Sequence, residues 1–502
     1  MVNKITALLL AVSLLGLSAL TFTGCGEENP PSSVTTSEES SASPDTSADI
    51  PAETAPLTAY DYLPDKDYNG KAFDMMTHKN SRYAPGQFIT EEETGDLIMD
   101  AAYRRNLAVS EKFDVKFTNN SVTSGSYPDL VRAELMAQTT DIDMLFGGLT
   151  TVHPLSTEGF FAVNSILPYQ QNLEDKPWYT PNLNKGLIYK GKQSMFFSDM
   201  TCINFPYGTF MNVSLGERMG ITGVEKMALE GKWTIDRLLE YSAKGSVDLD
   251  GDGAWTKADQ YGFGSYIAVN NTSNGDTALS FQYGMGQFTT AINESGEPIL
   301  TVNSERTLQI LDKLNSLFYM DNRTDFFNTG KTGAMVFAEN RMLFFNAILM
   351  HAPNYMRDMT DTYIALPMPK LDEDQKDYHT IVSVTGSVHM IPRTVDDPEF
   401  ASLIFDALSY EGYKQVTPAC FEFSMKLKYA ANEAASQLYD IIRDSMMMDF
   451  GMVYDGGIGM STIVSGLLAR KSMDFASAYA SLEPKALAHY ADVIKELTKT
   501  EN

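Results

Sequence analysis

The stretch GDLIMDAAYRRNLAVSEKFDVKF, residues 95–117, decides the fold because a helical pattern in it runs directly into a strand pattern. Apolar residues recur at helical spacing, with Leu97 and Ala101 on one row and Ile98 and Ala102 on the next. DVKFTN at 114–119 then alternates as a strand does, and the compact apolar run KAFDMMT precedes the helix from residue 71. The pattern predicts a strand, a helix and a second strand in succession.

A second unit of the same kind follows. Pro128 stands where a first helical turn tolerates proline, and Leu130, Ala133 and Ala137 mark one helical face. IDMLFGG at 142–148 is typical of a buried strand that ends in glycines, which completes a βαβαβ pattern and indicates an α/β fold.

In open α/β sheets, ligands bind beyond the carboxyl ends of the strands. We therefore expect Gly148 and Thr150, in the loop after the third strand, to contact a ligand. A plain turn at the end of a strand is the alternative interpretation of this loop.

The second half of the chain alternates helices and strands again. GKWTIDRLLEYSAK at 231–244 predicts a helix capped by Thr234, and Asp397 with Pro398 predicts the start of a helix that runs to about Tyr410. MLFFNAILM and DTYIALPMP are typical of strands, and two helical stretches, around 433–447 and 484–499, close the chain.

The composition argues against one large class of partner. The 502 residues include 65 acidic and 38 basic side chains, which give a formal net charge of -27. Such a charge repels phosphate backbones, so we expect no nucleic-acid partner. With 43% apolar residues the chain can bury substantial cores, and its length indicates two or more domains.

The N-terminal segment has the pattern of an export signal. Lys4 precedes an apolar core that is too short for a permanent span, so we expect residues 1–24 to be a signal peptide. FTGC at 22–25 resembles the lipobox of bacterial lipoproteins, which implies lipidation of Cys25; ordinary signal cleavage nearby is the alternative. Residues 25–60 are acidic and rich in Ser, Thr and Pro, which predicts a disordered tether.

The remaining cysteines are Cys202 and Cys420. In an exported protein they could pair. Because disulfide frameworks are characteristic of much smaller secreted domains, we expect two separate buried thiols instead.

DLDGDGAWTKAD at 248–259 has the spacing of a twelve-residue calcium loop. Crowded carboxylates repel each other unless a hard cation neutralises them, so we expect a structural Ca²⁺ between a helix and a strand. A solvated acidic turn is the alternative, and a final Asp in place of the usual Glu favours weaker binding. The expected ligands are Asp248, Asp250, Asp252, the Ala254 carbonyl, Thr256 through a water, and Asp259.

Patterns typical of catalysis are scarce. The sequence has no HExxH, CxxC or GxSxG, and its six histidines are scattered singly. The 65 acidic residues are numerous enough to include a pair of glycosidase carboxylates, but no pattern selects one. We therefore expect a protein that is not an enzyme.

The order of these features resembles a known family. The lipobox, the acidic tether, residues 95–117, the helix followed by the acidic loop, and ALSYEGYKQVTPACFEFSMKLKYA are together similar to extracellular solute-binding lipoproteins of bacterial ABC importers, the carbohydrate type. The resemblance covers roughly residues 66–500. It implies a two-lobed α/β fold whose crossing strands form a hinge. The implied first lobe is 66–195 plus 386–428, and the second is 200–383 plus 430–502.

The resemblance also implies where a solute would lie. Sugars expose hydroxyls at their edges and C–H faces above and below, so recognition needs carboxylates or amides together with an aromatic plate. For every candidate, core packing or a surface turn is the alternative. The candidates are Gly148, Thr150, Asp199 near a crossing, Tyr207 just after it, Tyr283 and Phe345.

The resemblance implies a function as well. We expect a monomer, held by its lipid on the extracellular face of the cell membrane, that captures a small solute, an oligosaccharide, by lobe closure and delivers it to an ABC permease. A lipid-anchored surface glycoside hydrolase is the alternative from another class. A sensory protein that presents its ligand to a receptor kinase is a third.

Overall fold

The computed structural model describes residues 58–79, 87–123, 127–138, 141–202, 206–256, 258–265, 276–320, 330–426 and 433–499. The expected signal peptide, Cys25 and the tether as far as residue 57 lie outside these residues. The chain from Pro56 to Asn502 forms one compact unit. Within the described part of the chain, every helix is too short or too polar to cross a membrane.

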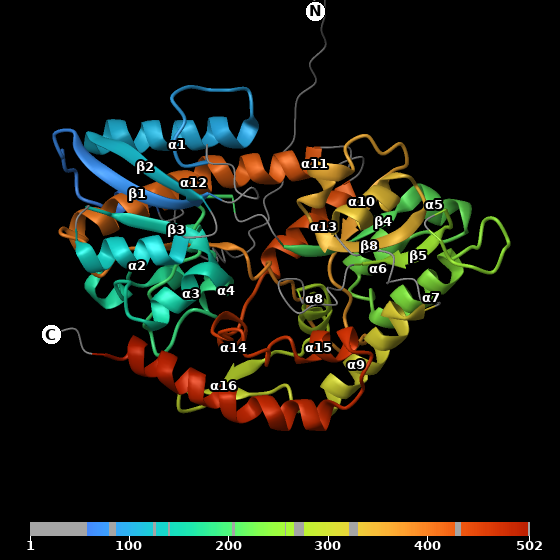
Figure 1. The fold of residues 1–502 in the computed structure, drawn as a ribbon. Coiled ribbons are helices and arrows are strands. Elements are labelled where there is room, and N and C mark those ends of the chain that lie inside the picture. The colour runs from blue at the N-terminus through green and yellow to red at the C-terminus, as the bar shows by residue number, and fades with distance from the viewer. Residues whose placement is uncertain are drawn as a thin grey trace, which may run out of the picture. The chain divides into compact units, whose positions relative to one another are not determined.

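The first sheet has the strand order β10-β3-β1-β2, and Figure 1 labels its strands β1, β2 and β3. Strands β1, β2 and β3 are mutually parallel, and β10 joins the sheet antiparallel to β3. The predicted βαβαβ pattern is confirmed. The strands are β1 (Lys71–Lys79), β2 (Val115–Thr123), β3 (Met144–Gly148) and β10 (Ser387–Met390).

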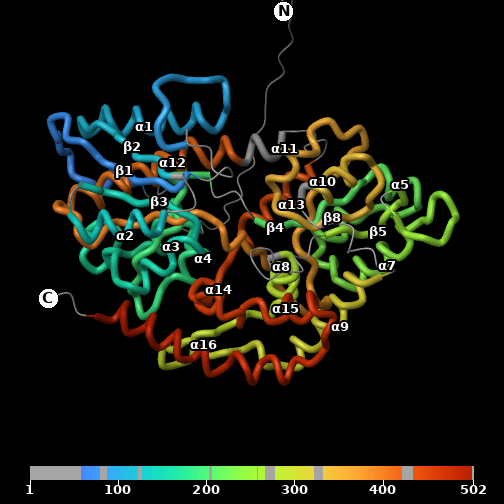
Figure 2. The backbone as a smooth tube through the Cα atoms, viewed as in Figure 1, coloured from blue at the N-terminus to red at the C-terminus, as the bar shows by residue number. Residues whose placement is uncertain are grey.

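Helix α1 (Leu97–Phe113) forms where the helical spacing predicts it. The Asp96 carboxylate accepts hydrogen bonds from the N–H groups of Ile98 and Met99, both at 3.0 Å, and so caps the helix. Helix α1 lies alongside α12 (Pro398–Lys426) in the backbone trace of Figure 2, and apolar residues of the two helices pack in one cluster. The other helices of this lobe are α2 (Tyr127–Ala137), α3 (Leu149–Thr157) and α4 (Pro181–Asn184), with short 3₁₀ turns η1 (Ala59–Asp61), η4 (Asn164–Ile166), η5 (Leu173–Asp175) and η6 (Pro177–Tyr179).

Helix α12 is longer than the sequence pattern predicts. It begins after Asp397, whose carboxylate accepts from the Phe400 N–H at 3.0 Å, but it continues past Tyr410 to Lys426 with Pro418 inside it. The expected end near Tyr410 is therefore wrong. Burial of Val416 against α1 continues the apolar face, and this packing outweighs the helix-breaking tendency of the proline.

The second sheet has the order β5-β8-β4-β9. Strand β4 is antiparallel to β8 and β9, and β5 is parallel to β8. Its strands are β4 (Tyr207–Asn212), β5 (Tyr261–Gly264), β8 (Met342–Ile348) and β9 (Tyr363–Leu366), with a separate hairpin of β6 (Thr290–Ile292) and β7 (Pro298–Leu300). The helices that accompany it are α5 (Val213–Arg218), α6 (Val224–Leu229), α7 (Ile235–Gly245), α8 (Asp276–Gly284), α9 (Glu305–Phe318), α10 (Gly330–Ala338), α11 (His351–Tyr355), α13 (Glu433–Asp444), α14 (Phe450–Val453), α15 (Ile463–Ala469) and α16 (Phe475–Leu497).

Two segments that we call the first and second crossings connect the sheets. The first crossing is described at 199–202 and at Pro206, and the second spans 380–386. They lie side by side, because Pro206 forms a bridge with Val382 and the Tyr207 N–H donates to the Ile381 carbonyl at 3.0 Å. Residues 427–432, between α12 and α13, lie outside the described part of the chain.

Cys202 and Cys420 form a disulfide, with their Cα atoms 6.0 Å apart. The expectation of two separate thiols is therefore wrong. A helix that ends near Tyr410 leaves Cys420 without a defined position, whereas the longer α12 carries it beside the first crossing. Gly412 allows this approach, because a Cβ atom there would collide with the backbone of Asp199.

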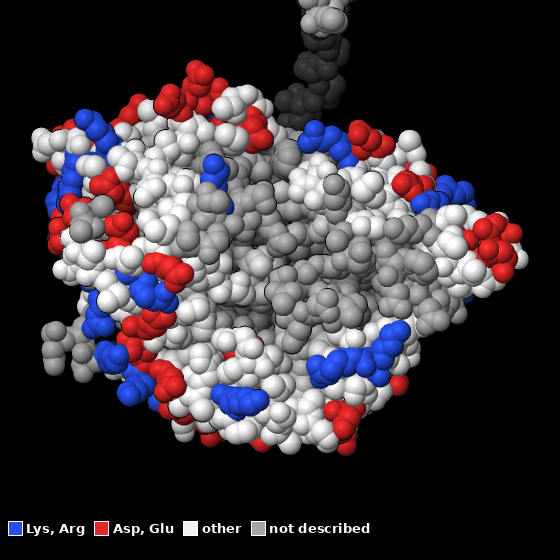
Figure 3. All heavy atoms as spheres, viewed as in Figure 1, with Lys and Arg blue, Asp and Glu red and all other residues white. Residues whose placement is uncertain are grey.

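Charged side chains are interspersed over the visible face of the protein. In Figure 3, the described acidic and basic residues on this face alternate and do not form one continuous basic patch.

Candidate functional site

The turn between β3 and α3 lies at the carboxyl end of the parallel strands. The Leu149 N–H donates to the Gly386 carbonyl at 2.8 Å, and the Thr150 N–H donates to the Val384 carbonyl at 3.3 Å. A Cβ atom on Gly148 would lie 3.1 Å from the Thr385 carbonyl oxygen, so glycine permits this close contact. Gly148 and Thr150 therefore lie where the first sheet meets the second crossing, and the Thr150 side chain is exposed.

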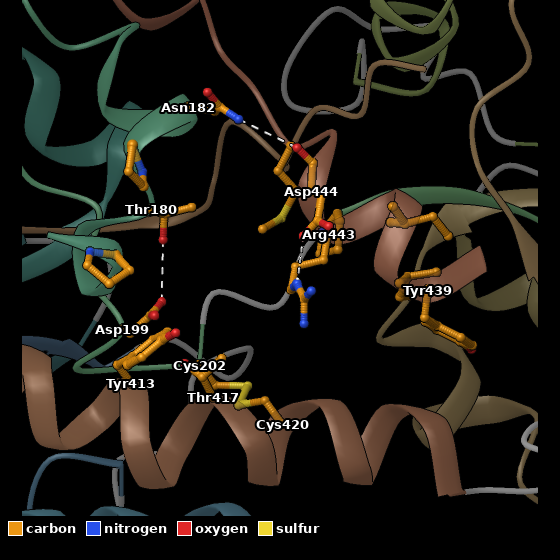
Figure 4. A pocket seen from close by; sticks show the side chains of 16 residues that line it. Thr180, Asn182, Asp199, Cys202, Tyr413, Thr417, Cys420, Tyr439, Arg443 and Asp444 are labelled. Carbon is orange, nitrogen blue, oxygen red and sulfur yellow. Dashed lines mark hydrogen bonds and ion pairs between the residues drawn. A yellow bond between two sulfur atoms is a disulfide. The ribbon is translucent and has the colours of Figure 1, made fainter. Parts of the chain in front are cut away.

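A cavity of about 480 Å³ lies beside the first crossing, and we call it the crossing cavity (Figure 4). Its lining comes from the η6–α4 segment and α12 on one side and from α13 and the end of β8 on the other, so both lobes contribute. The lining residues are Pro177, Thr180, Pro181, Asn182, Asp199, Cys202, Pro206, Leu349, Tyr413, Thr417, Cys420, Tyr439, Ile442, Arg443, Asp444 and Met446.

Asp199 is the buried carboxylate of the crossing cavity, with 8% of its surface exposed. It accepts a hydrogen bond from the Thr180 hydroxyl at 3.3 Å and is also hydrogen-bonded to the Thr417 side chain. Burial raises the pKa of Asp199 to about 7, because the two threonines and the charge of Arg443 offset only part of the desolvation.

The opposite wall is helix α13. Its Arg443 is paired with two acids, through Nε to Asp444 at 2.9 Å and through a terminal nitrogen to Asp440 at 3.3 Å. Asn182 of α4 donates to the Asp444 carbonyl at 3.5 Å, which links the first lobe to α13 (Figure 4). Tyr439 lies one helical turn before Arg443 and lines the same cavity.

A second, more open cavity of about 830 Å³ borders the first and shares Asn182, Asp444 and Met446 with it. Its other lining residues include Lys376, Asp377 and His379. Burial lowers the pKa of His379.

The remaining predicted solute contacts lie in or near the cores. Tyr207 begins β4 and is 8% exposed. Tyr283 of α8 and Phe345 of β8 have no exposed surface, and the Tyr283 hydroxyl donates to the Asp449 carboxylate at 2.7 Å. In this structure Tyr283 and Phe345 are therefore core-packing residues, which was the alternative to a contact with the solute.

The acidic loop 248–259 brings three carboxylates together. One oxygen from each of Asp248, Asp250 and Asp252 lies within 4.8 Å of the others. The Asp252 N–H bond lowers the pKa of Asp250, but desolvation and the neighbouring carboxylates raise it above its ordinary value overall. Gly253 has φ +80°, the left-handed conformation that the sharp turn needs.

Asp259 takes a different part in this loop. Its carboxylate accepts from the Leu249 N–H at 3.0 Å and from the Thr256 N–H at 2.6 Å, and these bonds lower its pKa. The Thr256 hydroxyl accepts from the Ala258 N–H at 3.1 Å. The donor set therefore fits a hard cation at the first three acids, while Asp259 ties the two ends of the loop.

No family model matches the sequence, and no curated protein is similar to it. Solved structures match its fold. These structures are solute-binding proteins for carbohydrates, many of them described as components of ABC transporters, and the chain has their two-lobed α/β fold. The expected fold is therefore confirmed.

Three structures illustrate the match. The galacto-N-biose/lacto-N-biose I-binding protein of Bifidobacterium longum is 12% identical with TM-score 0.55, covering 87% of this chain and 100% of that one. The cyclic alpha-maltosyl-1,6-maltose binding protein of Arthrobacter globiformis is 13% identical with TM-score 0.54, covering 84% and 99%. A cyclo/maltodextrin-binding protein is 14% identical with TM-score 0.53, covering 86% and 98%.

Sequence reasoning did not select most residues of the crossing cavity. Thr180, Thr417, Tyr439 and Arg443 are separated by up to 263 positions, and their short-range patterns are ordinary. The one available signal was the spacing of Tyr439 and Arg443, which places both on one face of a helix.

Proposed function

We propose that this protein captures a small solute, a carbohydrate, between its two lobes and delivers it to an ABC permease. The observation that carries the proposal is the pair of α/β sheets joined by adjacent crossings, in the fold of solved structures whose bound sugars include lacto-N-biose and maltotetraose. A solute that contacts both lobes binds best when they are closed, so it shifts the equilibrium towards the closed form.

The proposed solute site is the carboxyl edge of the first sheet, with Gly148 and Thr150 as contacts. The second crossing borders this edge through Val384 and Thr385. Backbone groups and a hydroxyl suit a sugar, whose edge carries both donors and acceptors.

The proposal includes a lipid anchor. Cys25, after the lipobox-like FTGC, is the proposed acylated residue, and residues 26–60 are the proposed tether to the extracellular face of the cell membrane. We propose a monomer in solution. Replacement of Cys25 with Ser should release the protein from the membrane fraction into the medium; retention would contradict the anchor.

The proposal also includes a structural calcium ion in the acidic loop. The convergence of Asp248, Asp250 and Asp252 supports it, and oxygen donors suit a hard cation. The ion would fix the turn between α7 and β5. It has no part in solute binding.

A screen of the purified protein tests the main proposal. Thermal shift and calorimetry are measured over disaccharides, linear and cyclic oligosaccharides, peptides and polyamines. We expect at least one oligosaccharide to raise the melting temperature and to bind with a stoichiometry of one. If peptides alone bind, the carbohydrate assignment is wrong. Release of reducing ends from the bound sugar would favour the glycoside hydrolase instead.

A further inference from the structure

The crossing cavity has the size and lining of a small-molecule site. Its volume of about 480 Å³ lies in the range of ligand pockets, and five separate chain segments converge on it. It lies against the first crossing, whereas the β3–α3 turn lies against the second crossing. Among the described residues, those that line the cavity are separate from that turn. The cavity is therefore distinct from the proposed solute site.

The Asp199 carboxylate leaves the cavity in need of a further hydrogen-bond donor or a positive charge. The two hydrogen-bond partners of its carboxylate among the described residues are the hydroxyl groups of Thr180 and Thr417. A carboxylate has about four acceptor positions, so Asp199 can accept further donors. A buried carboxylate without a paired cation is costly, and a positively charged ligand would relieve that cost.

Arg443 does not neutralise Asp199, because Asp440 and Asp444 already pair with its guanidinium group. The charged groups that line the cavity are two acids, Asp199 and Asp444, and one base, Arg443. Their sum is negative. The surroundings therefore favour a cation over an anion.

Aromatic groups supply the second part of a cation site. Tyr413 of α12 and Tyr439 of α13 line the cavity from opposite lobes (Figure 4). Aromatic faces attract organic cations and pack against the hydrocarbon next to the charge.

We propose that the crossing cavity binds a small organic cation, with its ammonium group beside Asp199 and its hydrocarbon chain between Tyr413 and Tyr439. The ligand contacts both lobes and the first crossing. Its binding therefore favours one arrangement of the lobes and is coupled to solute binding, and the coupling acts equally in both directions.

The protonation of Asp199 gives this binding a pH dependence. The other titratable groups that line the cavity are Tyr413 on α12 and Tyr439, Arg443 and Asp444 on α13. Burial raises the pKa of Asp199 to about 7, so its carboxylate is charged mainly above that pH. Binding of a cation should be stronger at about pH 8 than at about pH 5.5, with a proton released on binding near pH 7.

Matched probes test the proposal by calorimetry on the purified protein. 1,4-Diaminobutane is the cationic probe, and 1,4-butanediol has the same chain without charge. We expect the diamine to bind and the diol to bind at least ten-fold more weakly. Equal affinities for the two, or no diamine binding at millimolar concentration, would overturn the proposal.

Asp199→Asn is the matching variant, and Asp175→Asn is its control, since Asp175 is an exposed acid on the same lobe. Asp199→Asn should lower diamine affinity at least ten-fold, and Asp175→Asn should leave it unchanged. If Asp199→Asn does not fold, diamine affinity of the wild-type protein is compared at about pH 5.5 and about pH 8. An affinity that is the same at both pH values overturns the proposal. A saturating sugar that displaces the diamine by direct competition would place both ligands in one site and also overturn it.

Discussion

The disulfide between Cys202 and Cys420 joins the first crossing to helix α12, across a sequence separation of 218 residues. The segment between these cysteines contains the whole second sheet and the strand β10 of the first. The bond therefore closes a loop that contains all the strands of the second sheet, and it forms part of the wall of the crossing cavity.

Reduction of this disulfide should destabilise the protein. A cross-link restricts the unfolded chain more as its loop becomes longer, and native disulfides of this kind contribute about 2–4 kcal/mol. Urea unfolding with and without dithiothreitol should show a lower midpoint after reduction. A variant with both cysteines changed to Ser should match the reduced protein and be insensitive to dithiothreitol. Equal midpoints for the oxidised and reduced protein would contradict the prediction.

Asp199→Asn should stabilise the protein increasingly as pH rises. Burial raises the pKa of Asp199 in the folded state to about 7, well above the value of a free Asp. The folded protein therefore binds the Asp199 proton more tightly than the unfolded chain does. The stability that comes from this difference is fully present below about pH 4 and is lost as pH rises through 7. Asn does not ionise. The difference in unfolding free energy from wild type should grow by about 1–4 kcal/mol between about pH 5 and pH 8.

The comparison must be made with wild type at each pH. Burial lowers the pKa of His153 to about 4 and of His389 to about 3, so both histidines reduce stability as pH falls below about 6.5. The histidines make the unfolding free energy rise with pH, whereas Asp199 makes it fall. The histidine contribution is the same in wild type and in Asp199→Asn, so it cancels in the difference. A difference that stays constant from about pH 5 to pH 8 would show that Asp199 ionises normally.

Calcium should raise the melting temperature through the acidic loop. One millimolar CaCl₂, compared with a chelator, should give a rise of about 2 °C or more, because bound ion stabilises the folded state alone. Asp250→Asn should abolish the rise. Solute affinity should be unchanged by the chelator at a temperature where the protein remains folded.

Asp259→Asn separates the two parts of this loop. Its carboxylate accepts backbone N–H groups of Leu249 and Thr256, so its loss should lower the melting temperature in the presence of chelator as well. No calcium-dependent change in the wild-type protein would mean that these hydrogen bonds alone hold the loop.

The sequence allowed the parallel part of the first sheet to be predicted because its signals are local. The compact apolar run of β1, the alternation in β2 and the helical spacing in α1 each lie within one element. The pairing of β10 with β3 depends on contacts between Ser387 and Gly148, which are far apart in the chain. The placement of β10 in the first lobe therefore came from the resemblance to a family.

The candidate site was harder to predict for a related reason. An aromatic residue in the core and one that stacks on a sugar give the same local sequence pattern. The sequence therefore could not show that Tyr283 and Phe345 are core residues. Asp199 was selected for its nearness to a crossing, but its threonine partners Thr180 and Thr417 come from separate elements. The disulfide was missed because the size of the chain argued against one, and no local pattern places Cys420 of α12 beside Cys202.

Thr150 offers the most direct test of the proposed solute site. Its N–H is used by the Val384 carbonyl, whereas its hydroxyl is exposed at the carboxyl edge of the first sheet. Thr150→Ala should lower the affinity for the oligosaccharide found in the screen by about 5-fold to 30-fold, the effect of one lost hydrogen bond of about 1–2 kcal/mol. Calorimetry measures it. Thr157→Ala, at the other end of α3, is the control, because the Thr157 hydroxyl already donates to the Pro154 carbonyl at 2.9 Å. Equal affinities for the two variants would place the solute away from this edge.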